Sequence, residues 1–195
     1  MPNYYKELPE NYELVKTIDA KNVKTVIWMN VIGLAIFVVT IIPFLLLKEY
    51  SLRNVEPIDL LIFLGVYLIL TVVYVIMHEL THGLVYKIMT KQKLTFGLTL
   101  SCAFCGVPKI FVTRKTALLA ILAPFVLYTL VFVPILILMP ANMISLAILL
   151  VFGTHTCGCV GDLYGTIVLI SLKGELLMND TGPKQTFFVK NNWII

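Results

Sequence analysis

Residues 60–89 read LLIFLGVYLILTVVYVIMHELTHGLVYKIM, and the class of fold follows from this stretch. It is apolar until a few polar side chains appear near its end, and it exceeds the ~20 residues that a helix needs to cross a bilayer. At ~1.5 Å per residue, a helix of this length is about 45 Å long, so we expect it to tilt or to protrude from the bilayer. The stretch therefore predicts a transmembrane helix.

Three further apolar segments, at 26–47, 117–139 and 143–172, are also long enough to span a bilayer. The chain has 195 residues, of which 59% are hydrophobic and only 13% are charged. A soluble domain of this length would carry far more charge. We therefore expect an all-α integral membrane protein with about four transmembrane helices.

The distribution of lysine and arginine predicts the orientation of these spans. Four lie in residues 1–24, two in 48–58, six in 87–115, none in 140–142 and three in 173–195. Cytoplasmic loops carry the excess of positive charge, so both termini and the 87–115 loop are predicted to be cytoplasmic in a multi-pass protein of the cell membrane. The net charge of +4 without a long basic run speaks against nucleic acid as a partner.

Two runs in the 87–115 loop favour β-structure. Residues 94–100 and 107–113 are rich in β-branched and aromatic side chains, and they flank residues 101–106. This pattern predicts a short β-hairpin within 92–114 on the cytoplasmic side, and residues 186–189 also resemble a strand. No short apolar region typical of a cleaved signal begins the chain, so we expect the N-terminal segment to be retained. The predicted parts are a cytoplasmic segment (1–24), a membrane domain with the hairpin (25–173) and a cytoplasmic tail (174–195).

The sequence His78-Glu79-Leu80-Thr81-His82 lies inside the predicted second span. On a helix, an H-E-x-x-H motif places two imidazoles one turn apart on one face, where both can bind one Zn²⁺ ion. The intervening Glu79 can then serve as the general base that activates a water. Ionisable side chains are costly in hydrocarbon, so their presence here indicates a functional site.

A third ligand is expected from the fourth apolar segment. It holds His155 and Asp162, whereas the first and third segments have no ionisable residue deep inside them. Asp162 matches the motif histidines in its distance from the cytoplasmic end of its span, and a carboxylate would leave a fourth zinc position for water. A carboxylate that only pairs with ions or packs helices is the alternative. Several glycines in this segment are expected to let it approach the second span closely: Gly153, Gly158, Gly161 and Gly165.

His155 has several possible roles. In one continuous helix it would project from roughly the same face as Asp162, about 10 Å away. It is interpreted as a competing ligand, a stabiliser of the transition state or a group that supports the ligands, and its depth favours the last two. A structural, hydrogen-bonded histidine is an equal alternative.

Two other patterns have simpler interpretations. Cys102 and Cys105 lie in the loop, and Cys157 and Cys159 lie in a span. We therefore interpret them as ordinary small apolar residues rather than as a four-cysteine metal site, and we expect no disulfides. Asp180-Thr-Gly182 matches an aspartic-protease signature but occurs once, in a polar tail and before a proline, so it predicts a turn.

The motifs together resemble a known family. His78-Glu-Leu-Thr-His-Gly83, Ala-Pro-Phe at 123–125 and Gly-Asp-Leu at 161–163 are similar to those of small bacterial membrane proteins classed as zincin peptidases, related to intramembrane metalloproteases of the site-2 protease type. The resemblance covers roughly residues 60–190. The chain departs from the site-2 proteases proper, which carry an Asn-Pro segment before an Asp-Gly: here Leu163 follows the aspartate.

The resemblance implies a zinc-dependent metalloendopeptidase that cleaves a membrane protein or a membrane-associated peptide in the lipid bilayer. His78, His82 and Asp162 would hold Zn²⁺, Glu79 would transfer the proton, and His155 would hydrogen-bond the developing oxyanion. The hairpin would bind the substrate by strand addition. The alternatives are a non-catalytic zinc-binding regulator or carrier, and a subunit with a decayed site. Glu79 speaks against decay, because zinc binding alone does not need it.

Overall fold

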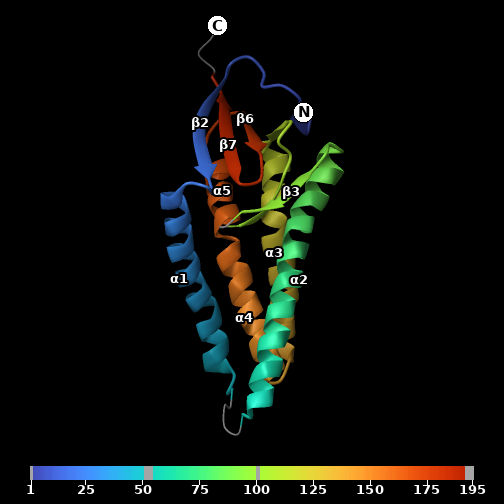
Figure 1. Ribbon diagram of the computed structural model, residues 1–195. Helices are drawn as coiled ribbons and strands as arrows, with labels where there is room; N and C mark the ends of the chain where they lie inside the picture. Colours follow the sequence, from blue (N-terminus) through green and yellow to red (C-terminus); the bar gives the residue numbers. More distant parts are fainter. Residues whose placement is uncertain (1, 51–54, 100–101, 192–195) are drawn as a thin grey trace. The chain divides into compact units, whose positions relative to one another are not determined.

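A computed structural model describes residues 2–50, 55–99 and 102–191 (Figure 1). The chain is mostly helical. The helices are α1 (Val23–Leu47), α2 (Pro57–Thr90), α3 (Arg114–Leu138), α4 (Met143–Gly158) and α5 (Val160–Ser171). By length and composition, four of the described helical segments are apolar enough to cross a membrane: α1, α2, α3 and the α4–α5 pair. The sequence-based prediction of four candidate spans is therefore confirmed, while their placement and orientation in a bilayer stay predictions.

Helix α2 buries polar side chains and exposes apolar ones. Apart from Gly83, its buried residues recur every four positions and form one stripe: Tyr74, His78, His82, Tyr86 and Thr90. Between them, large aliphatic side chains such as Leu84 and Ile88 are 60% and 65% exposed. This pattern suits a helix whose outer surface meets lipid, because polar groups in hydrocarbon need partners inside the protein.

Strands from both ends of the chain and one short strand from the middle of the sequence, β5, form a five-stranded antiparallel sheet. Its order is β1-β5-β6-β7-β2, so the N-terminal segment supplies both edge strands. The sequence predicted the strand near 186–189 and β-structure over 107–113, which includes β5, but not the other three strands. The sheet makes the fold less purely helical than expected. The strands are β1 (Tyr4–Tyr5), β2 (Tyr12–Asp19), β5 (Phe111–Thr113), β6 (Leu176–Asp180) and β7 (Lys184–Lys190).

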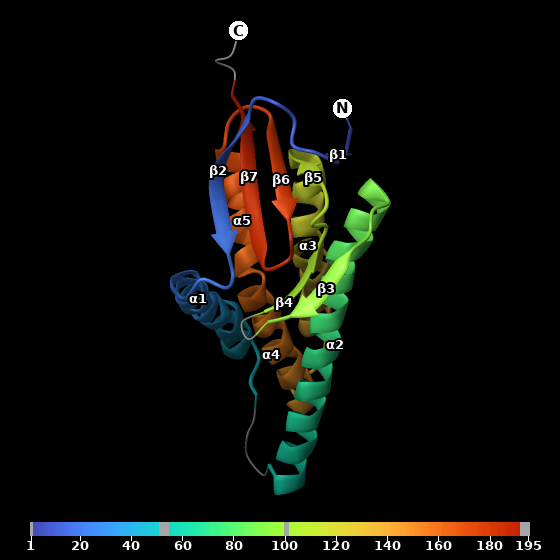
Figure 2. The same ribbon diagram turned by 45° about the horizontal axis from the view of Figure 1, so that its top comes forward.

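One face of this sheet packs on α5 and on the N-terminal half of α3 (Figure 2). Strand residues Val112, Met178 and Phe187 are fully buried against Ile121 of α3 and Leu169 of α5. Burial of each such side chain stabilises the fold by roughly 1.5–3 kcal/mol. The sheet is therefore held firmly on the helices that carry one of the predicted site residues.

The predicted hairpin exists, but its second strand is not where the sequence placed it. Strand β3 (Thr95–Leu98) pairs with β4 (Ala103–Gly106), and Phe96 lies opposite Cys105. The prediction assigned the second strand to 107–113, which is wrong. Residues in that range, Val107, Ile110 and Val112, are instead almost fully buried in the core of the larger sheet. Residues 100–101 of the expected hairpin, and Arg53 of the loop used for orientation, lie outside the described residues.

Contacts divide the chain into two units, which are described separately. Unit 1 comprises Met1–Met29, His78–Pro124 and Gly161–Ile195, and it holds the sheet, the hairpin and the H-E-x-x-H motif. Unit 2 comprises Asn30–Met77 and Phe125–Val160.

Within unit 2, glycines bring α4 close to α1. A Cβ on Gly153 would lie 2.6 Å from the Phe37 ring, and a Cβ on Gly33 would lie 2.8 Å from the Cys157 sulfur. The hydroxyls of Thr40 and Thr156 hydrogen-bond at 3.0 Å between the same helices. Of the four glycines that were expected to approach the second span, Gly153 thus lies against the first.

The fourth apolar segment is not one continuous helix. Helix α4 ends at Gly158, Cys159 forms its C-cap, and α5 starts at Val160. The break lies between Gly158 and Gly161, and glycine is a poor helix former. His155 and Asp162 therefore lie on two helices and in different units, and their shared face stays a prediction.

Candidate metal centre

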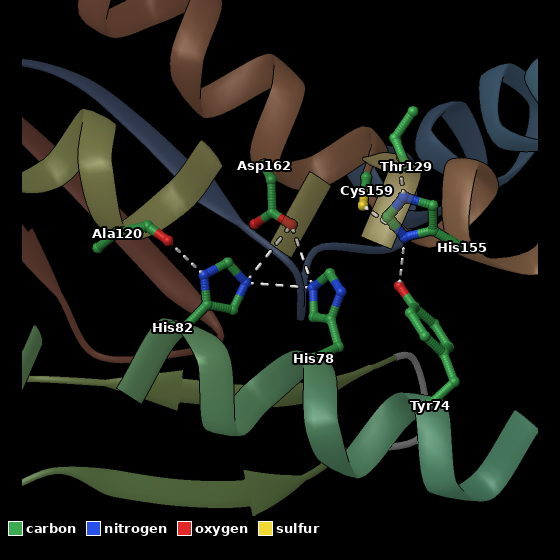
Figure 3. Close-up of polar contacts among 8 residues, drawn as sticks. All are labelled: Tyr74, His78, His82, Ala120, Thr129, His155, Cys159 and Asp162. Atoms are coloured by element: carbon green, nitrogen blue, oxygen red, sulfur yellow. Dashed lines mark hydrogen bonds and ion pairs between the residues drawn. The ribbon is translucent and has the colours of Figure 1, made fainter. Parts of the chain in front are cut away.

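Three side chains of unit 1 converge on one point. His78 and His82 lie on α2, and their Nε2 atoms are 3.1 Å apart. The Oδ2 atom of Asp162, on α5, lies 3.3 Å from His78 Nε2 and 3.5 Å from His82 Nε2 (Figure 3). The structure thus brings together the three residues that the sequence nominated as ligands, although their binding of zinc stays a prediction.

The spacing of these three atoms suits a tetrahedral zinc ion. Zinc bonds of ~2.0–2.2 Å to nitrogen and oxygen, at tetrahedral angles, separate neighbouring ligand atoms by roughly 3.3–3.6 Å. The separations of 3.1, 3.3 and 3.5 Å lie close to this range. Two imidazoles and a carboxylate are also the donor set of many catalytic zinc sites. The residues therefore fit the metal without rearrangement of the helices.

A hydrogen bond to the ring nitrogen of His82 that faces away from Asp162 fixes the orientation of its imidazole. The Nδ1 atom of His82 lies 2.8 Å from the backbone oxygen of Ala120 on α3. A carbonyl only accepts, so Nδ1 donates the hydrogen and Nε2 keeps its lone pair on the side of Asp162. Such second contacts fix the tautomer and orientation of metal-binding histidines.

The helix break at Cys159 places Asp162 in the first turn of α5. The break is confined to this one residue, because Cys159 has helical backbone angles and its N–H still donates to His155 O at 3.0 Å.

Glu79 meets the hairpin. It is half-buried on α2, and the backbone N–H of Cys105 in β4 hydrogen-bonds to its carboxylate. On the other strand, Phe96 packs directly over Gly83: a Cβ at Gly83 would lie 2.7 Å from its ring. The glycine that follows the motif thus lets β3 lie close against α2, beside the predicted ligands.

His155 belongs to unit 2 and is fully buried. Its Nδ1 lies 2.9 Å from the Tyr74 hydroxyl and its Nε2 lies 3.2 Å from the Thr129 hydroxyl (Figure 3). The rings of Phe125 and Phe152 stack on it at 5.9 and 6.0 Å. Both ring nitrogens therefore have hydroxyl partners inside unit 2.

The four cysteines are divided between the units. Cys102 and Cys105 lie in unit 1, Cys157 and Cys159 lie in unit 2, and no disulfide joins these four described residues. Burial, together with the nearby charges of Asp180 and Glu79, raises the pKa of the Cys105 thiol to about 12. The Cys105 thiol is therefore protonated at neutral pH.

Asp180 is the last residue of β6, directly before the turn at 181–183, and it is buried. The Gly182 N–H donates to its Oδ1 at 2.8 Å, and the Tyr86 hydroxyl donates to its Oδ2 at 2.7 Å. The side chain is 3% exposed, and this burial raises its pKa to about 6 although both donors favour the charged form. The pair with Tyr86 was missed, because only the four-residue spacing from His82 could have indicated that Tyr86 faces inward.

Comparison with known proteins gives one match. Residues 71–176, which include the H-E-x-x-H motif and Asp162, match the family described as "Putative zincin peptidase". No curated protein and no solved structure gives a significant match. The matched range covers more than half of the chain, and the protein therefore belongs to this zincin peptidase family.

Proposed function

We propose that the protein is a zinc metalloendopeptidase that cleaves membrane-embedded or membrane-associated proteins. The observation that carries the proposal is the convergence of His78 Nε2, His82 Nε2 and Asp162 Oδ2 within 3.5 Å of one another, beside Glu79. Family membership supports a metallopeptidase. The candidate spans support a substrate at or in the membrane, because the polar site lies on helices with apolar outer surfaces.

Zinc held by these three residues would polarise the scissile carbonyl and make a water acidic enough to attack at neutral pH. Glu79 accepts the proton of the attacking water and delivers it to the leaving amine. The Cys105 N–H orients the Glu79 carboxylate, so that one oxygen is held while the other receives the proton. His82 is kept in its metal-binding tautomer by Ala120.

The hairpin supports an extended substrate. Among the described residues, β3 and β4 pair only with each other, and Phe96 and Leu98 of β3 are 47% and 80% exposed. A peptide added as a further strand would gain backbone hydrogen bonds and apolar contacts with such side chains. Extension also exposes the carbonyl that a helical substrate would keep in its own hydrogen bonds.

For His155 we propose a supporting role. Its nitrogens already contact Tyr74 and Thr129, and a direct bond to an oxyanion would require it to give up one of them. A direct role in stabilising the oxyanion remains the second proposal for this residue. Conversion to Gln, which keeps a donor and an acceptor, should lower kcat by about tenfold or less if the role is indirect.

The test is Glu79→Gln in purified protein, with labelled casein as an unfolded probe, alongside a comparison of membrane proteomes from cells with each form. Glu79→Gln should keep its zinc and lose at least ~10²-fold in cleavage, in line with the loss of a general base. Glu175→Gln is the matched control, because Glu175 is exposed and lies in the loop before β6.

Equal cleavage by wild type and Glu79→Gln would refute the assignment of Glu79. Bound zinc, with neither casein cleavage nor any accumulated membrane protein in the Glu79→Gln cells, would instead favour the zinc-binding regulator or carrier.

A further inference from the structure

The C-terminal turn of unit 1 contacts both elements that meet at Glu79. Through its side chain, Asp180 accepts the hydroxyl of Tyr86, which lies one helical turn after His82 on α2. Through its backbone oxygen, the same residue accepts the N–H of Val107 at 2.8 Å, directly after β4 ends. Asp180 thus links α2, which carries the H-E-x-x-H motif, to strand β4 of the hairpin.

These contacts close a ring. From Glu79 the ring runs to the Cys105 N–H, along β4 to Val107, through Asp180 to Tyr86, and back along α2 to Glu79. Helix and strand are rigid elements, so each of the two bridges fixes the other. If the bridge at Asp180 loosens, β4 is free to move away from Glu79.

The turn is built to hold Asp180 in this place. The Gly182 N–H donates to the Asp180 carboxylate, and Gly182 has a φ of +94°, which a glycine adopts without strain. Gly106, the last residue of β4, has no side chain, so the backbone of residues 180–182 lies directly against it. Tyr86 and Asp180 are 1% and 3% exposed, so water cannot replace their hydrogen bond.

We propose that Asp180 is a positioning residue for Glu79, acting through Tyr86 and the backbone of β4. The inference rests on the proposed peptidase function. In this view the C-terminal strands are part of the catalytic apparatus: they set the distance between β4 and the motif helix. A purely structural pair would stabilise the fold without affecting the chemical step.

The test compares Asp180→Ala and Tyr86→Phe with Thr181→Ala. Phe keeps the ring in the core and removes only the hydroxyl, whereas Ala removes the carboxylate that accepts from Tyr86 and from Gly182, so both variants remove the bridge. Thr181 is the matched control, because it lies in the same turn and its hydroxyl donates only to Lys184 O within that turn. Three quantities are measured: zinc content, kcat and KM for a fluorogenic casein-derived peptide, and amide hydrogen exchange of residues 103–107.

Both bridge variants should lower kcat by about tenfold or more, as partners behind an active-site group do. Zinc content and KM should stay within about twofold of wild type, and exchange at residues 103–107 should rise. The double variant should lose no more than Asp180→Ala alone, because both changes remove the same bond between Tyr86 and Asp180.

The proposal is overturned if kcat in both variants equals that of Thr181→Ala, or if exchange at 103–107 is unchanged. A fall in kcat that follows a matching loss of zinc also overturns it. The exchange measurement needs no cleavage, so it tests whether Asp180 holds β4 in place even if wild type cleaves nothing. Absence of cleavage by wild type would count against the peptidase proposal instead.

Discussion

Replacement of Gly106 by alanine should unfold unit 1 more easily than any comparable glycine replacement outside it. Gly106 ends β4 where the 180–182 turn packs against it. An added Cβ would lie 2.7 Å from the carbonyl carbon of Thr181 and 2.9 Å from the oxygen of Asp180, and it would also clash with the Gly182 nitrogen. These atoms are backbone, so no side chain can swing aside and the turn must move.

The cost follows from two contributions. Overpacking of this kind costs about 1–3 kcal/mol. Displacement of the turn also breaks the hydrogen bond from Val107 N–H to Asp180 O, which contributes about 1 kcal/mol. The sum of about 2–4 kcal/mol corresponds to a fall in Tm of roughly 5–15 °C for a chain of this size.

The assay is thermal unfolding in detergent, with Gly65→Ala as the matched control. Gly65 lies inside α2, and a Cβ there would have no described atom within 4 Å beyond its chain neighbours and the backbone of its own helix. Alanine favours a helix over glycine by ~1 kcal/mol, so this variant should unfold at the same temperature as wild type or slightly higher. A Gly106→Ala midpoint within about 2 °C of wild type would refute the docking of the turn on β4.

Three other perturbations have defined outcomes. Gly83→Ala should push the Phe96 ring off α2 and reduce cleavage while zinc stays bound, which metal analysis and a casein assay check; normal cleavage would contradict the packing of β3 on the motif helix. The pKa of Asp180 is raised from 3.8 to about 6, so the native state binds the extra proton. The stability that this proton confers is complete below pH ~4 and is lost as the pH rises through 6, by about 3 kcal/mol in total. Thermal midpoints of Asp180→Asn should therefore lack this part of the pH dependence, and parallel curves for the two proteins would contradict it. Removal of zinc by a chelator should lower Tm by roughly 5–10 °C relative to protein with zinc at about 100 times its Kd, and added zinc should restore it; an unchanged Tm would argue against zinc bound to the native state.

The parts of this structure that the sequence predicted are those encoded locally. Apolar length alone indicated four candidate spans, and the spacing of His78 and His82 placed both imidazoles on one face. The position of Asp162 followed from its distance to the end of its span, which depends on helix rise and little else.

The parts that the sequence did not predict depend on distant partners. Strand β2 pairs with β7, whose Lys190 lies opposite Tyr12, and no local pattern in either strand specifies the other. Residues 107–113 have the composition of a strand, but they pack in the core of the larger sheet, where β5 pairs with β6. The second hairpin strand was therefore misplaced. The helix break at Cys159 was missed because flanking glycines weaken a helix without determining where it ends.

The zinc content of the purified protein tests the central claim most directly. Wild type should carry zinc in proportion to protein, Asp162→Ala should lose it, and His155→Gln should retain it, because the Asp162 carboxylate lies beside both His78 and His82 in unit 1. Loss of zinc from His155→Gln with full retention by Asp162→Ala would contradict the site as assigned.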